Sequence, residues 1–89
     1  MPIISIFFGI TIRMHYRDHN PPHFHAEYQG LEGLISIETG RLIQGDLPPK
    51  IVSMLRRWVM KRKRELLENW RRARAKEPLY SIPGADYDS

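Results

Sequence analysis

Hydrophobic residues in the first part of the chain alternate with polar ones in the manner of β-strands. Residues 3–8 and 10–16 are rich in β-branched and aromatic side chains, and Gly9 between them indicates a sharp bend or bulge. In the second segment every other residue is apolar, which predicts one face against a core and one face in water. The chain therefore begins with two strands that turn back on each other.

A proline-containing loop separates these strands from a second pair. Residues 17–22 (RDHNPP) predict a turn or loop, because proline cannot donate to a strand ladder. Residues 23–28 and 31–38 predict a hairpin around Gln29-Gly30. A short strand over residues 41–44 is expected to follow.

From Pro48 onward apolar residues recur at helical spacing. Asp46 or Leu47 is expected to cap this helix, and Pro48 suits its first turn. The run KRKR at 61–64 is a full turn without an apolar residue. Two helices could meet there, but we favour one kinked helix, which Pro78 ends.

These elements predict an α+β fold, in which a mainly antiparallel sheet of four to five strands precedes a C-terminal helix or kinked helix pair packed on one of its faces. The predicted core consists of Phe7, Phe8, Ile10, Ile12, Phe24, Ile35, Ile37, Leu55, Trp58, Leu66 and Trp70.

The length of 89 residues predicts one domain, over residues 1–83, followed by a flexible acidic tail at 84–89. A domain this small has a thin stability margin, so a homodimer would help it. The absence of cysteine excludes disulfides and thiolate ligands and fits the cytoplasm. The apolar start lacks a basic leader region and is too short to span a bilayer, so we expect no membrane association.

Charge is distributed unevenly along the chain. Residues 48–76 hold eleven Lys/Arg and two acidic residues, a net charge of +9, whereas residues 1–47 carry −2 and residues 77–89 carry −3. Such a stretch predicts binding to nucleic acid, since cations near phosphates gain affinity by counterion release. The alternatives are an acidic partner protein or a solvated helix face. The acidic tail can fold back and screen the stretch, so deletion of residues 84–89 should strengthen binding. The candidate binding residues are Arg56, Arg57, Lys61, Arg62, Lys63, Arg64, Arg71, Arg72 and Arg74.

All four histidines fall within eleven residues. His23 and His25 share one strand face with Glu27, while Asp18 and His19 come from the preceding loop. Because imidazole is a common metal ligand, Asp18, His19, His23 and His25 are candidate ligands for zinc or another divalent metal. A metal-free reading makes His19, His23 and His25 acid/base catalysts. The third reading is that these histidines are solvated or contact a partner. No other cofactor is expected.

Several segments of the sequence resemble one family. They are the opening MPIISIFFGITIRM, the central DHNPPHFHAEY, the stretch ISIETGRLIQGDLP and the run ELLENW. On these motifs the chain, over about residues 1–83, is identified as a member of the bacterial domain of unknown function 4160 family. Asp18, His19, Pro21, Pro22, His23, Phe24 and His25 match the family's motif, and His15 does not belong to it.

The resemblance implies a small α+β fold, a neighbouring operon-encoded partner protein and, for some members, a place in toxin–antitoxin systems. Many members carry a histidine where this chain has Arg62, which makes a shared metal site less expected here and a phosphate-facing surface more so. Three functions remain open. They are a nucleic-acid- or partner-binding component of a toxin–antitoxin-like operon, a metal-dependent or histidine-based hydrolase or ribonuclease, and a plain interaction domain.

Overall fold

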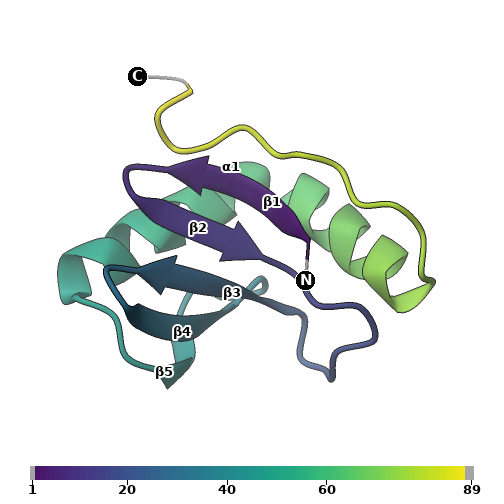
Figure 1. Cartoon of the computed structure of the whole chain (residues 1–89), viewed down its shortest axis with the longest axis horizontal. Coiled ribbons are helices and arrows are strands. Elements are labelled where there is room, and N and C mark those ends of the chain that lie inside the picture. The colour runs from purple at the N-terminus through teal and green to yellow at the C-terminus, as the bar shows by residue number, and fades with distance from the viewer. Residues whose placement is uncertain (1, 88–89) are drawn as a thin grey trace.

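The computed structural model describes residues 2–87 and has one antiparallel sheet backed by one helix (Figure 1). The sheet is a meander in which each strand pairs with its neighbour in sequence, in the order β1-β2-β3-β4-β5. This arrangement confirms the predicted α+β fold with its C-terminal helix. The elements are β1 (Ile3–Phe7), β2 (Ile10–Arg13), β3 (His23–Tyr28), β4 (Leu31–Ser36), β5 (Leu42–Gly45) and α1 (Pro49–Arg74).

The strand register separates a core face of the sheet from an open face. Ile12 lies opposite Ala26, and Ala26 lies opposite Gly33; all three are buried. The residues between them point the other way, since successive side chains alternate across a sheet. The side of the sheet turned away from α1 therefore carries the polar half of the pattern.

Of the predicted core residues, ten are buried and Phe8 is the exception. Phe8 is 55% exposed and has a positive φ of 49° in the turn between β1 and β2. Strand β1 ends at Phe7, which packs against Trp58 at a ring-centroid distance of 4.9 Å. Because neighbouring residues alternate between faces, only one of the two phenylalanines can reach the core.

Helix α1 is a single helix with a break in its middle. Arg62 has non-helical angles (φ −113°, ψ 20°), which confirms the kinked helix favoured from the KRKR run. The expected cap at Asp46 or Leu47 is wrong. Pro48 occupies the N-cap position, with Pro49 opening the helix, and no side chain caps the end.

The segment after α1 runs back along β1 (Figure 1). Ile82 donates its backbone N–H to Ile4 O at 2.8 Å, and Ser5 Oγ donates to Ile82 O at 2.8 Å. The Trp58 indole N–H donates to Pro83 O at 2.9 Å. These bonds cover the outer edge of β1, which would otherwise present unpaired backbone groups.

The predicted acidic tail falls partly outside the described range. Asp88 and Ser89 lie beyond it, whereas the guanidinium carbon of Arg62 lies 5.7 Å from the ring centroid of Tyr87. Within residues 2–87, no helix has both the length and the apolar character needed to cross a bilayer.

Candidate functional site

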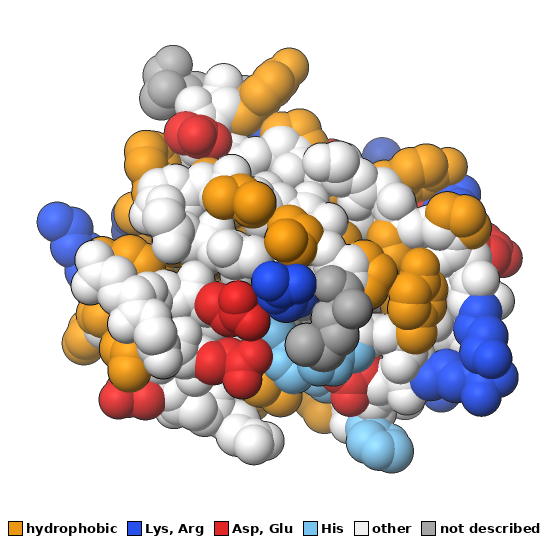
Figure 2. Space-filling view, in the orientation of Figure 1, with side chains coloured by type: hydrophobic (Ala, Val, Ile, Leu, Met, Phe, Trp, Pro, Cys, Tyr) orange, Lys and Arg blue, Asp and Glu red, His pale blue; other side chains and the backbone are white. Residues whose placement is uncertain are grey.

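A cluster of histidines and one aspartate lies on the open face of the sheet. His25 is in β3, where Arg13 of β2 and Leu34 of β4 are its lateral neighbours. His15 follows the end of β2, and Asp18 belongs to the loop that leads to β3. Figure 2 shows histidine side chains reaching the surface of this face beside acidic ones. The cluster is therefore assembled by two adjacent strands and their connecting loop.

His15 and His25 stack face to face. Their ring centroids are 3.8 Å apart and their planes differ by 8°. Burial, and then the adjacent His25, lower the pKa of His15 below its usual value of 6.5. Nε2 of His15 and Nδ1 of His25 are both buried and have no hydrogen-bond partner among residues 2–87. The pair thus holds two unused ring nitrogens in a partly buried place.

Asp18 joins this pair to the loop and to a third histidine. Its Oδ1 accepts the backbone N–H of His19 at 2.9 Å, and its Oδ2 accepts bonds from Nε2 of His23 at 3.0 Å and of His25 at 3.3 Å. Burial alone would raise the pKa of Asp18, but these donors outweigh it and the pKa is lowered. Asp18 is therefore a carboxylate at neutral pH.

His23 is the buried member of the cluster, at 5% exposure. Its Nδ1 faces Pro21 O at 2.8 Å, and its Nε2 faces the Asp18 carboxylate. A carbonyl and a carboxylate only accept hydrogen bonds, so each of these contacts uses a ring N–H of His23 as its donor. Its ring also packs against Trp70 of α1 at a centroid distance of 5.3 Å, which ties the cluster to the helix.

The structure brings together three of the four residues predicted from sequence as metal ligands. Asp18, His23 and His25 are hydrogen-bonded, whereas the His19 side chain is exposed and lines a hollow between the loop and β5. The group whose potential ligand atoms all lie within 4.8 Å of one another consists of His15, Asp18 and His25. The sequence-based prediction did not include His15 among the ligands. If the alternation of β2 is extended past Arg13, however, His15 falls on the same face of the sheet as Arg13.

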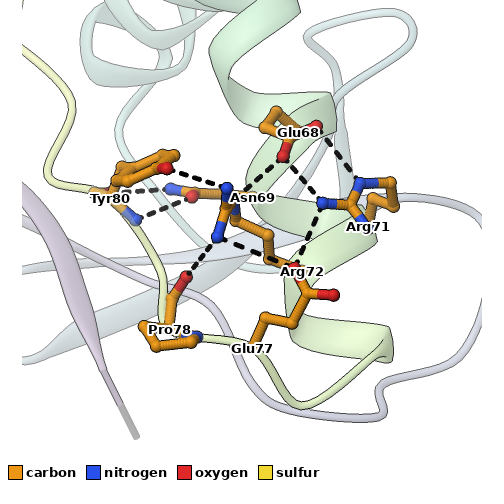
Figure 3. A network of polar contacts seen from close by, with 7 residues as sticks. All are labelled: Glu68, Asn69, Arg71, Arg72, Glu77, Pro78 and Tyr80. Carbon is orange, nitrogen blue, oxygen red and sulfur yellow. Dashed lines mark hydrogen bonds and ion pairs between the residues drawn. The ribbon is translucent and has the colours of Figure 1, made fainter.

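The nine basic residues predicted to bind nucleic acid do not share one environment. Arg62 pairs with Glu65, and Lys63 Nζ donates to Glu38 O at 2.9 Å. Near the end of α1, basic and acidic side chains form the network in Figure 3. There Arg71 pairs with Glu68 and Glu77, while Arg72 pairs with the same carboxylates and donates to Pro78 O and to the Tyr80 hydroxyl.

The other five predicted binding residues are exposed on α1: Arg56, Arg57, Lys61, Arg64 and Arg74. Arg57, Lys61 and Arg64 follow one another at spacings of four and three residues, which places them in one stripe along the helix. Arg56, Arg64 and Arg74 form no ion pair with any residue in the described range. The basic stretch is thus divided into an internal network and an exposed stripe.

The architecture defines a class of small α+β domain in which a five-stranded meander is backed by a helix and carries a histidine–aspartate cluster on its open face. The chain belongs to the family described as Domain of unknown function (DUF4160), which matches residues 9–71. That match includes the whole cluster and most of α1. No curated protein and no solved structure gives a significant match.

Proposed function

We propose that this domain binds nucleic acid through the outer face of α1. The observation that supports the proposal is the exposed stripe of Arg57, Lys61 and Arg64, which Lys50 extends by seven residues toward the start of the helix. From Lys50 to Arg64 the stripe covers roughly 21 Å at a rise of 1.5 Å per residue. That length matches roughly six phosphates of one strand at about 3.4 Å spacing.

The charge on this face favours a polyanion over an apolar partner. Each cation placed near a phosphate releases condensed counterions, so affinity needs no base-specific contact. The internal pairs of Arg71 and Arg72 are already satisfied by carboxylates and contribute less. The stripe is therefore expected to supply most of the binding.

The test compares two double variants with the same loss of charge. Arg57→Gln/Arg64→Gln removes two cations from the stripe, and Arg17→Gln/Arg41→Gln removes two exposed cations outside α1. Affinity for fluorescein-labelled RNA and DNA oligonucleotides is measured by anisotropy across a salt series. We expect the stripe variant to weaken binding at least 10-fold and to lower the slope of log K against log salt by about 1.5–2. Equal losses of affinity in both variants would mean that the net charge of the protein, and not the stripe, determines binding.

The family resemblance extends this proposal to a cytoplasmic role beside an operon-encoded partner, as in toxin–antitoxin systems. An acidic partner protein would compete for the same stripe. Expression of the untagged chain in bacteria, with and without its operon neighbour, measures the consequence for growth. Arrest that the neighbour relieves would support the toxin role, and a lack of any growth effect would argue against it.

A second candidate function is histidine-based cleavage of a phosphodiester. The His15–His25 stack favours it, because one neutral imidazole and one imidazole hydrogen-bonded to a carboxylate can act as a base and an acid. Incubation of wild type and His25→Ala with labelled RNA in EDTA tests it. Cleavage that the variant loses while remaining folded would support this function, and uncut RNA with wild type would exclude a metal-free reaction on that substrate.

A further inference from the structure

The His15–Asp18–His25 group has features that nucleic-acid binding on α1 does not use. Its potential ligand atoms lie within 4.8 Å of one another. The buried Nε2 of His15 has no hydrogen-bond partner within residues 2–87, although buried polar atoms usually have one. A buried ring nitrogen without a partner, beside a carboxylate and a second imidazole, points to a site that can bind a cation.

We propose that His15, Asp18 and His25 bind one divalent transition-metal ion on the open face of the sheet. Two imidazoles and one carboxylate suit Zn²⁺ and its neighbours in the first transition row, whereas Mg²⁺ and Ca²⁺ prefer oxygen ligands. Three protein ligands leave at least one coordination position for water or an anionic ligand. This proposal stands independently of nucleic-acid binding by α1.

Binding requires at most a small contraction of the group. Two ligand atoms each about 2.1 Å from one ion are at most about 4.2 Å apart, and the potential ligand atoms here all lie within 4.8 Å of one another. The stacked rings of His15 and His25 also direct their lone pairs along nearly parallel planes. Rotation of these rings about their side-chain bonds brings the lone pairs together. His15 lies outside any strand and is free of hydrogen bonds at Nε2, so it is the ligand that moves.

The neighbouring residues hold the other two ligands in place. His23 donates to Oδ2 of Asp18 and thereby fixes the carboxylate. Glu32 Oε2 lies 3.7 Å from Nδ1 of His25. With an ion on Nε2 of His25, the one proton of the neutral ring would lie on Nδ1, on the side of Glu32. Such carboxylate–histidine–metal arrangements orient ligands in known metal sites.

The experiment titrates the untagged full-length chain, freed of metal with EDTA, with Zn²⁺ by isothermal calorimetry. We expect one ion per chain and no saturable binding of Mg²⁺. His15→Ala should weaken Zn²⁺ binding by more than about 100-fold. About 100-fold is the largest loss usual for a residue that only hydrogen-bonds to a metal ligand. His19→Ala is the matched control, because it removes an exposed histidine from the same loop region and should retain wild-type affinity. Circular dichroism in EDTA checks that both variants are folded.

A readout on the unaltered protein makes the test independent of folding of the variants. In two-bond ¹H–¹⁵N spectra, ring nitrogens of His15 and His25 should shift and saturate at one equivalent of Zn²⁺, while those of His19 stay in place. The proposal is overturned if wild type shows no saturable binding, if His15→Ala binds as wild type does, or if His19→Ala loses as much affinity as His15→Ala.

Discussion

Asp18 illustrates how one residue organises a loop. Its carboxylate accepts a backbone N–H from His19 and bonds from the side chains of His23 and His25. Hydrogen bonds to a charged acceptor are stronger than neutral ones, so the loop between β2 and β3 is held against the sheet without regular structure. The same bonds explain why Asp18 stays ionised despite partial burial.

Glu32 provides a residue-scale test of the proposed metal site. Glu32→Gln removes the charge 3.7 Å from Nδ1 of His25 and should weaken Zn²⁺ binding by about 10-fold. This loss of affinity is at the lower end of the usual range for such residues, because half of the Glu32 side chain is exposed. Glu27→Gln is the control, because Glu27 lies opposite Glu32 in the strand register and its carboxylate pairs with Arg13 instead. Calorimetry that gives the same loss for both variants would assign the effect to general charge.

Asn69 makes a second residue-scale prediction, about stability. Its side chain is fully buried, donates to Tyr80 O at 2.8 Å and accepts the Tyr80 N–H at 2.9 Å (Figure 3). Asn69→Ala leaves both backbone groups without their partner and should lower the free energy of unfolding by about 2 kcal/mol. Urea denaturation measures it, with the exposed Ser81→Ala as a control expected to stay within about 0.5 kcal/mol. A loss no larger than that of the control would mean that water replaces the Asn69 bonds.

At the scale of elements, α1 uses its cations in two ways. Its middle presents an exposed stripe, whereas its last turns use Arg71 and Arg72 to hold the segment that returns along β1. A guanidinium offers five donors in a fixed fork, so Arg72 can bind Glu68, Pro78 O and the Tyr80 hydroxyl at once. The end of the helix therefore holds the C-terminal segment in place through these hydrogen bonds and ion pairs.

The contribution of the Glu68 ion pairs to the free energy of unfolding should depend on pH. Hydrogen bonds from Arg71, and further bonds from Arg72, lower the pKa of Glu68 in the folded state below its usual 4.5. The unfolded chain then binds more protons in that range, so the stability contribution is complete above about pH 4.5 and lost as pH falls through the folded pKa. In urea titrations the wild type should lose more stability between pH 5 and pH 3 than Glu68→Gln. Parallel pH curves for the two proteins would contradict this assignment.

At the scale of the whole molecule, the two proposed surfaces lie on opposite layers. The helix covers one face of the sheet, and the histidine cluster lies on the other (Figures 1 and 2). The two layers are linked by the contact between His23 and Trp70 and by the hydrogen bond from the Arg17 N–H to Ala73 O at 3.3 Å. The arrangement predicts that each surface can be altered without damage to the other.

Cross-testing the variants measures that independence. His15→Ala should change nucleic-acid affinity by less than about 2-fold, and Arg57→Gln/Arg64→Gln should leave Zn²⁺ affinity unchanged, because distant sites without shared partners behave additively. Anisotropy and calorimetry provide the two readouts. A substantial loss of nucleic-acid binding in His15→Ala would place the histidine cluster in the same binding surface as α1.

How far the sequence predicts this structure depends on the range of the interactions. Alternation along β2 and β3, and helical spacing after Pro48, are local patterns and gave the strands, the helix and its break near Arg62. The pattern also gave the shared face of His23 and His25. It did not separate Phe7 from Phe8, because both are equally apolar and only the point at which β1 ends decides which of them is buried.

By itself, the sequence determined the α+β class, the order of the elements and the uneven distribution of charge, because each follows from hydrophobic period or composition along the chain. Only the tertiary structure decided that His15 stacks on His25, that His19 points away, and that Arg71 and Arg72 also bind Glu77 beyond the end of the helix. Those outcomes depend on strand register, loop path and the return of the C-terminal segment. These features bring together side chains whose separation in space is not encoded in their spacing along the chain.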